Sequence, residues 1–161
     1  MLAGLTEDMS RRIENGLADL LVKAEAEAVF LCNKGGYILA QTSVEEYGHS
    51  DNIAALAAGS FFATREIARL VGEPEFRCVF HQGAKKSLFM QNTPMDLLLV
   101  VVFGEQSNPG LVKLCVDEVC AWLDASLGSA GNERSVQEEL QRTEMSLNEA
   151  APLFRRAPDP D

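Results

Sequence analysis

Two histidines and four cysteines are the residues of this sequence with the widest range of chemistry. His49 and His81 each lack a second histidine at the spacing of a zinc site, so the sequence indicates no metal ligands. The cysteines form no C-x-x-C pair, and three lie in apolar runs, as is typical of buried free thiols in a reducing compartment. They stand at positions 32, 78, 115 and 120. A Cys–His pair would meet only in space, so that possibility stays open. For His81 we favour a structural hydrogen bond at a strand end.

A segment with glycine and lysine, Gly83-Ala-Lys-Lys-Ser87, is similar to the end of a phosphate-binding loop. It lacks the first glycine of that motif, has alanine between glycine and lysine, and falls between two expected strands. We therefore exclude a nucleotide site here. The sequence also contains no G-x-S-x-G, no H-E-x-x-H and no recognisable carboxylate pair. It predicts no catalytic residue and no cofactor site, and hence a protein that is not an enzyme.

The charge balance narrows the class of partner. The chain of 161 residues carries 14 Lys and Arg against 24 Asp and Glu, a net charge of -10. This balance argues against nucleic acid or an anionic membrane as the main partner, because both attract clustered cations. The longest apolar run, Leu97 to Phe103, is far shorter than the ~20 residues of a membrane span. With no basic and apolar leader at the N-terminus, the sequence predicts a cytoplasmic protein.

The hydrophobic periodicity predicts helices and strands in a regular order. We expect helices over residues 6–24, 50–72 and 109–127, and strands over 28–32, 37–42, 75–81, 86–91 and 95–103. Thr6, Ser50 or Asp51, and Asn108 are the expected helix caps, and Gly72 suits a left-handed residue after the second helix. The last strand is apolar at every position, which predicts a central strand covered on both faces.

The middle helix, 50–72, has two stripes of residues, of which one should face the core. The larger residues predict a core-facing stripe of Ile53, Leu56, Ser60, Ala63, Ile67 and Leu70. A second stripe points elsewhere and contains Ala55, Gly59, Phe62, Glu66 and Arg69. Small residues crowd the first half of the helix, so another backbone can approach it closely. Two interpretations remain open: the helix lies flat on its own sheet, or it forms an interface.

The composition changes after residue 128. We expect a domain over 1–128 and an acidic tail over 129–161, in which large apolar residues are rare and proline returns. The stretch 146–154 opens with a Ser-x-x-Glu capping box and includes Leu153 and Phe154, the size of a short docking helix. The alternative is a disordered tail with incidental apolar residues.

Several segments carry a resemblance to a known family. They are Val29-Phe-Leu-Cys-Asn-Lys-Gly-Gly-Tyr-Ile-Leu, Ala54-Ala-Leu-Ala-Ala-Gly, Leu70-Val-Gly-Glu-Pro-Glu-Phe, Phe80-His-Gln-Gly-Ala-Lys-Lys-Ser-Leu-Phe-Met90 and Gly110-Leu-Val-Lys-Leu. Over about residues 20–128 the chain resembles the roadblock (dynein light chain) family, and within it the bacterial MglB branch. The Phe-His-x-Gly-Ala-Lys-x-Ser-Leu segment is the most specific part of this resemblance.

The resemblance implies a fold and a mode of assembly. The expected fold is an α/β (α+β) sandwich, the roadblock fold, with a five-stranded antiparallel sheet and the order α-β-β-α-β-β-β-α. Family members form homodimers through the middle helix and the third strand, which would otherwise be an unprotected edge. The expected dimer interface contains Ala54, Ala58, Phe61, Arg77 and Val79.

The resemblance also implies a partner, a small Ras-like GTPase of the MglA type, whose GTP hydrolysis the dimer stimulates without an arginine of its own. The Mg²⁺ and phosphoryl chemistry belong to the GTPase. The expected partner-binding residues are Ala55, Gly59, Phe62, Arg65 and Glu66, with Leu153 and Phe154 from the tail. At Phe62, Arg65 and Glu66 this chain has bulk and charge where the family is mostly small, and we expect Phe62 to be exposed.

Two other functions fit the same sequence. One is a non-catalytic scaffold that pairs with another roadblock protein or with a response-regulator-type protein. The other is a small-molecule sensor. A sensor requires a polar-lined cavity, whereas the inward positions of the expected sheet are filled by Leu, Val and Phe.

Overall fold

The computed structural model describes residues 6–93, 95–127 and 141. Its elements are α1 (Glu7–Lys23), β1 (Ala28–Cys32), β2 (Ile38–Ser43), α2 (Ser50–Leu70), β3 (Cys78–Gln82), β4 (Lys86–Asn92) and β5 (Leu98–Gly104). A third helix covers residues 109–127. The expected five-stranded antiparallel sheet with the order α-β-β-α-β-β-β-α is therefore confirmed.

The chain divides into two compact units, Met1–Asp124 and Ala125–Asp161. The fold and the sites described below lie in the first unit. The predicted boundary at 128/129 stays a prediction, and the predicted docking helix at 146–154 lies outside the described residues.

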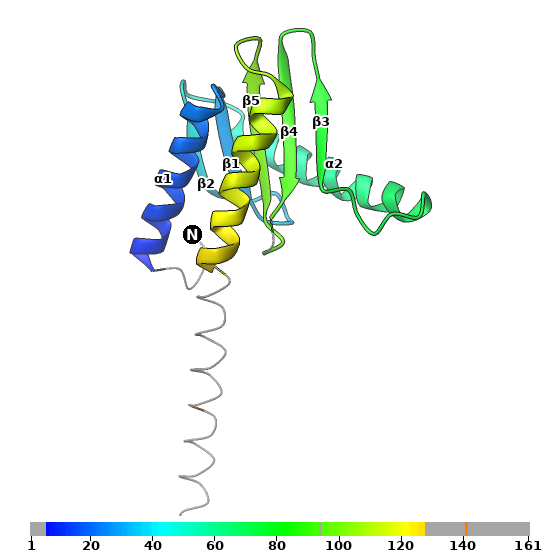
Figure 1. Cartoon of the computed structure of the whole chain (residues 1–161), viewed down its shortest axis with the longest axis horizontal. Helices are drawn as coiled ribbons and strands as arrows, with labels where there is room; N and C mark the ends of the chain where they lie inside the picture. The colour runs from blue at the N-terminus through cyan, green and yellow to red at the C-terminus, as the bar shows by residue number, and fades with distance from the viewer. Residues whose placement is uncertain (1–5, 94, 128–140, 142–161) are drawn as a thin grey trace, which may run out of the picture. The chain divides into compact units, whose positions relative to one another are not determined.

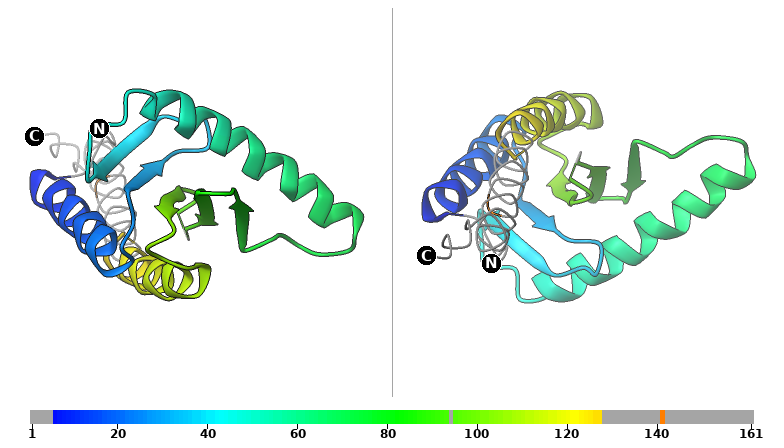
Figure 2. Two further views of the ribbon diagram at one scale, coloured as in Figure 1. Left: turned by 90° about the horizontal axis from the view of Figure 1, so that it is seen from above. Right: turned by 90° about the horizontal axis from the view of Figure 1, so that it is seen from below.

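The sheet has the strand order β2-β1-β5-β4-β3, and every neighbouring pair is antiparallel. In Figures 1 and 2, α1 and the third helix cover one face of the sheet and α2 lies against the other. Strand β5 is the middle strand, and its residues up to Phe103 are buried, as its uninterrupted apolar sequence predicts. Strands β2 and β3 are the two edges.

Alternation along the strands divides the core between the two faces. On the α2 face, Phe30, Met90 and Val100 pack with small residues of the helix. Alternating residues such as Leu31 and Val101 point to the opposite face, which α1 and the third helix cover. Each face is thus closed by side chains whose positions repeat every second residue.

Most of the local signals in the sequence act as expected. The Thr6 hydroxyl accepts a hydrogen bond from the backbone N–H of Met9 at 3.2 Å, and Asn108 Oδ1 accepts one from Leu111 at 2.9 Å. Gly72 adopts φ +85° after α2. The expected cap of α2 was wrong. His49 holds that position without a side-chain hydrogen bond, and the Ser50 hydroxyl instead donates to the carbonyl of Tyr47.

Two strands are shorter than their apolar sequences predict. Strand β3 begins at Cys78 rather than at residue 75, because the preceding residues form the connection from α2, in which Glu75 is ion-paired. Strand β5 begins at Leu98 rather than at residue 95. The chain turns before it, with a hydrogen bond from Thr93 to the Leu97 carbonyl and a left-handed Asp96 at φ 57°.

The expected core-facing stripe of α2 was wrong for most of its residues, although Ile53 is half-buried and packs against the core cluster. The helix buries small residues and one phenylalanine against the sheet: Ala54, Ala57, Ala58, Phe61 and Ala68. Leu56 and Leu70 are each 74% exposed and Ile67 is 52% exposed. The helix therefore lies with its small side toward the sheet and its large apolar residues toward the outside.

Candidate protein-binding surface

The side of α2 that faces away from the sheet forms one continuous surface. Its residues are Ala55, Leu56, Gly59, Ala63, Glu66, Ile67 and Leu70, which we call the outer α2 face. They recur at three- and four-residue spacing and so lie along one side of the helix. A Cβ added at Gly59 would meet no atom within 4 Å. Exposed apolar residues gathered on one side of a helix are typical of a protein-binding surface.

The second half of α2 extends beyond the sheet. Figure 2 shows the helix running past β3, the last strand, so that its C-terminal turns have no strand of the described chain beneath them. Val71, which follows the helix, is 65% exposed. Strand β3 pairs with β4 on one side, and within the described residues its other edge is unpaired. An open strand edge beside an overhanging apolar helix is suited to a second polypeptide.

The predicted partner-binding residues on α2 fall into two groups. Ala55, Gly59 and Glu66 are exposed on the outer α2 face, where Glu66 pairs with Arg69 at 3.1 Å. Phe62 does not project freely, contrary to expectation. It is half-buried and packs against the core cluster beneath α2, and the Arg65 guanidinium lies 5.5 Å from its ring centroid.

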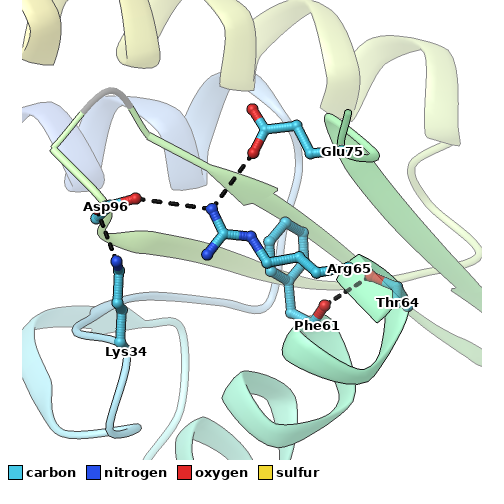
Figure 3. A network of polar contacts seen from close by, with 6 residues as sticks. All are labelled: Lys34, Phe61, Thr64, Arg65, Glu75 and Asp96. Carbon is cyan, nitrogen blue, oxygen red and sulfur yellow. Dashed lines mark hydrogen bonds and ion pairs between the residues drawn. The ribbon is translucent and has the colours of Figure 1, made fainter. Parts of the chain in front are cut away.

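Arg65 is engaged within the chain. Figure 3 shows its guanidinium between Glu75, at 3.3 Å, and Asp96, at 3.8 Å. Asp96 also accepts Lys34 Nζ at 2.7 Å. The hydrogen bond from Lys34 is the main reason that the pKa of Asp96 lies below its ordinary value, with Arg65 adding a smaller charge effect. Arg65 thus ties α2 to the connection after it and to the β4–β5 turn.

The predicted dimer residues also fall into two groups, one on α2 and one at β3. Ala54, Ala58 and Phe61 are at most 2% exposed, because they pack against the chain's own sheet. Their side chains are unavailable to a second chain, so the expectation for these three is corrected. Arg77 is exposed, and Val79 is half-buried on β3. Leu153 and Phe154 lie outside the described residues.

Sequence reasoning missed Leu56, Ile67 and Leu70 as surface residues because it placed them in the core. The signal that could have found them was the run of small residues on the neighbouring side. A helix buries small side chains where it lies close to another backbone. The β1–β2 turn also lies against the backbone of α2, since a Cβ at Gly36 would be only 2.5 Å from the Cα of Ala55.

A second polar cluster lines a cavity of about 510 Å³ near the starts of β1 and β4. Glu27 accepts hydrogen bonds from Lys86 at 2.7 Å and from the Tyr47 hydroxyl at 2.8 Å. These bonds lower the pKa of Glu27, the Lys86 bond most, and the pairing raises the pKa of Lys86. The cluster joins the segments that contain Glu27, Tyr47 and Lys86, and one carboxylate oxygen of Glu27 accepts both hydrogen bonds.

Two of the thiols are made less acidic by burial. Burial raises the pKa of Cys32 and of Cys120 to about 11, so both are protonated at neutral pH. In the part of the chain that the structure describes, no three His, Cys, Asp or Glu residues are grouped to hold a metal ion. Nor does any helix there have the length and apolar character to cross a membrane.

Residues 12–103 match the Roadblock/LC7 domain. This chain belongs to the Roadblock/LC7 family. Among solved structures, MglB of Myxococcus xanthus is 32% identical, with a TM-score of 0.69 over 73% of this chain and 96% of that chain. The gliding protein MglB of Thermus thermophilus is 29% identical, with a TM-score of 0.68 over 72% of this chain and 88% of that chain.

Two further proteins are similar to this chain. A structure described as MglB with a tetrameric arrangement is 29% identical, with a TM-score of 0.70 over 74% of this chain and 90% of that chain. An uncharacterized protein of Aquifex aeolicus (strain VF5) is 25% identical over 125 residues, which cover 76% of this chain and 77% of that protein. The resemblance to the MglB branch is therefore confirmed.

Proposed function

We propose that this roadblock protein is a homodimeric regulator that binds a small Ras-like GTPase of the MglA type and stimulates its GTP hydrolysis, in the control of bacterial polarity or motility. The outer α2 face carries the proposal, because it is a long, exposed, apolar helix surface on a chain 32% identical to an MglB. The gliding role in the name of the Thermus structure and the tetrameric arrangement of another MglB support motility and self-association. The free thiols suit the reducing cytoplasm.

The overhanging part of α2 and the edge of β3 are the surfaces that we assign to a second copy. Ile67, Leu70 and Val71 expose apolar area where the sheet has ended. Pairing of β3 with its copy would satisfy the unpaired backbone groups of the edge; Val79 lies on this strand and Arg77 directly before it. Both features lie on the same side of the domain, so one two-fold contact can cover both.

The first half of the outer α2 face is the surface that we assign to the GTPase. Ala55 and Gly59 allow a partner's backbone to approach, and Leu56 offers an exposed apolar anchor beside them. Phe62 and Arg65 support this surface from its border rather than project from it. Leu153 and Phe154 of the tail remain proposed as a second contact with the GTPase.

This protein would stimulate hydrolysis by positioning the GTPase's own catalytic groups rather than by supplying a catalytic group. Arg65 is held within the chain by Glu75 and Asp96, so its guanidinium is not free to enter a partner's site. The GTPase holds its own nucleotide and Mg²⁺. Docking on α2 would hold the GTPase's catalytic groups in line with the γ-phosphate. Catalysis of phosphoryl transfer depends largely on such positioning.

Calorimetric titration with an MglA-type GTPase from the same organism tests the binding step. We expect binding to the GTP-loaded form, weakened about fivefold or more by Leu56→Ala, since an interface anchor is typically worth at least 1 kcal/mol. Leu114→Ala, which alters an exposed leucine on the third helix, should leave affinity unchanged. Absence of binding would contradict the proposal, and binding without faster hydrolysis would support the scaffold instead.

A further inference from the structure

The end of α2 and the connection after it have little apolar packing of their own. We call residues 66–77 the overhang: the last residues of α2 and the connection that returns to β3. Within the overhang Ala68 is buried and Phe76 is half-buried, and every other residue is exposed. Segments with few buried apolar contacts open locally at a low cost in free energy. Contacts other than apolar packing must therefore fix the direction of the overhang.

A polar network joins the overhang to the rest of the domain through Arg65. The Arg65 guanidinium lies 3.3 Å from a carboxylate oxygen of Glu75, in the overhang, and 3.8 Å from one of Asp96, in the β4–β5 turn. The second oxygen of Asp96 lies 2.7 Å from Lys34 Nζ, in the β1–β2 turn. Figure 3 shows these four side chains as a continuous series of contacts. We call this network the Arg65 tether.

The geometry of Arg65 suits a residue that positions others. One planar guanidinium with several N–H donors can contact two carboxylates at once, which a lysine ammonium does less well. The guanidinium carbon also lies 5.5 Å from the centroid of the Phe62 ring, and Phe62 packs on the core cluster beneath α2. The Arg65 side chain is 32% exposed, so its ion pairs are partly shielded from solvent. Arg65 is thus itself held in place and can hold Glu75.

We propose that the Arg65 tether holds the overhang in the direction that self-association requires, which makes Arg65 a positioning residue of the interface. The inference rests on the proposed pairing of two copies, because Ile67, Leu70 and Val71, the apolar residues assigned to that interface, lie in the overhang. Without the tether the overhang samples other directions, and each copy must restore the productive one when two chains meet. A binding-competent state that is populated for only a fraction of the time lowers the apparent affinity by that fraction.

Amide hydrogen exchange of the full chain tests the tether itself. The backbone amides of Val71 and Glu73, in the overhang, donate to carbonyls of α2 at 3.1 and 2.9 Å. Arg65→Gln should speed exchange of both amides about fivefold, because partly exposed ion pairs and a cation–π contact are lost. The Leu99 amide, in the middle strand β5, should keep its rate because the core stays intact. The two proteins are compared in the same association state, as measured by sedimentation.

Sedimentation equilibrium then tests the role of the tether in self-association. Arg65→Gln should raise the dissociation constant about tenfold, because a two-fold dimer contains the tether twice. Glu75→Gln cuts the tether at the overhang and should act in the same direction; it replaces Arg65→Gln if that variant does not fold. Arg65→Lys keeps the charge and should lose less. Arg11→Gln is the matched control, because Arg11 is exposed on α1, which covers the other face of the sheet, and its constant should equal that of the wild type.

Four results would overturn the proposal. Unchanged exchange at Val71 and Glu73 in Arg65→Gln would show that the tether does not hold the overhang. Faster exchange at Leu99 as well would show that Arg65 stabilises the whole fold instead. Faster exchange in the overhang with an unchanged dissociation constant would show that the interface does not depend on the tether. A wild type that stays monomeric at micromolar concentrations would contradict the proposed self-association itself, and the exchange rates distinguish that failure from a failure of the tether.

Discussion

Leu70→Ala should weaken self-association strongly while leaving the fold intact. Leu70 is 74% exposed in the single chain, so most of its apolar surface is available to a second copy. The substitution removes three carbons, each of which contributes about 0.8 kcal/mol when it is fully buried. Because the side chain is 74% exposed in the single chain, about three quarters of that contribution is gained only at the interface. This amounts to about 1.8 kcal/mol per chain and about 3–4 kcal/mol per two-fold dimer. The dissociation constant should therefore rise about 100- to 1000-fold.

Sedimentation equilibrium over a concentration series measures this constant. Leu114→Ala is the matched control, because Leu114 is 61% exposed on the third helix, away from the proposed interface, and its loss should change the constant less than about threefold. Alanine preserves helix propensity in both variants. A wild type that stays monomeric at micromolar concentrations, or equal effects of the two substitutions, would refute the reasoning.

Other parts of the structure give four further predictions. Gly59→Ala should raise the free energy of unfolding by about 0.5–1 kcal/mol in urea titration, because alanine favours the helix and the added Cβ meets no atom within 4 Å; a loss of stability would contradict this. Glu27 has a pKa lowered from 4.5 on folding, so its pairing stabilises the fold above that pH. Glu27→Gln should therefore lower the melting temperature at pH 7, and this deficit should shrink as the pH falls below 4.5; a deficit independent of pH would argue against the pairing. Cys78 should react with a thiol reagent faster than Cys120, whose pKa is raised to about 11. Self-association through β3 should slow the reaction of Cys78, so a Cys78 rate that does not change with protein concentration would exclude β3 from the interface. Deleting residues 143–161 should leave the melting temperature unchanged and weaken GTPase binding, and unchanged affinity would exclude the tail as a contact.

The sequence predicted those parts of the fold that depend on local rules. The uninterrupted apolar run of β5 predicted a central strand, and Gly72 predicted the end of α2 through its left-handed backbone. Thr6 and Asn108 predicted helix starts because their side chains can accept a hydrogen bond from the following turn. Each of these signals is contained within a few residues.

The orientation of α2 could not be predicted by the same reasoning. Ranking residues by hydrophobicity placed Leu56 and Leu70 inside, but the distance between helix and sheet is set by backbones that approach closely, which favours Ala54 and Ala58 there. The partial burial of Phe62 follows from that orientation.

The polar contacts of the candidate sites depend on residues far apart in the sequence. Arg65, Glu75 and Asp96 come from a helix, a connection and a turn, and no spacing in the sequence relates them. The hydrogen bond from Gln91 to Asp117 likewise joins β4 to the third helix. Such sites require the tertiary structure.

Single-turnover GTP hydrolysis by an MglA-type GTPase from the same organism tests the central claim most directly, with the wild type compared against Gly59→Arg. Position 59 has open space around it, so the arginine variant should fold while its side chain blocks the outer α2 face. We predict faster hydrolysis with the wild type and the GTPase's intrinsic rate with Gly59→Arg. No acceleration by the wild type, or equal acceleration by both proteins, would contradict the account.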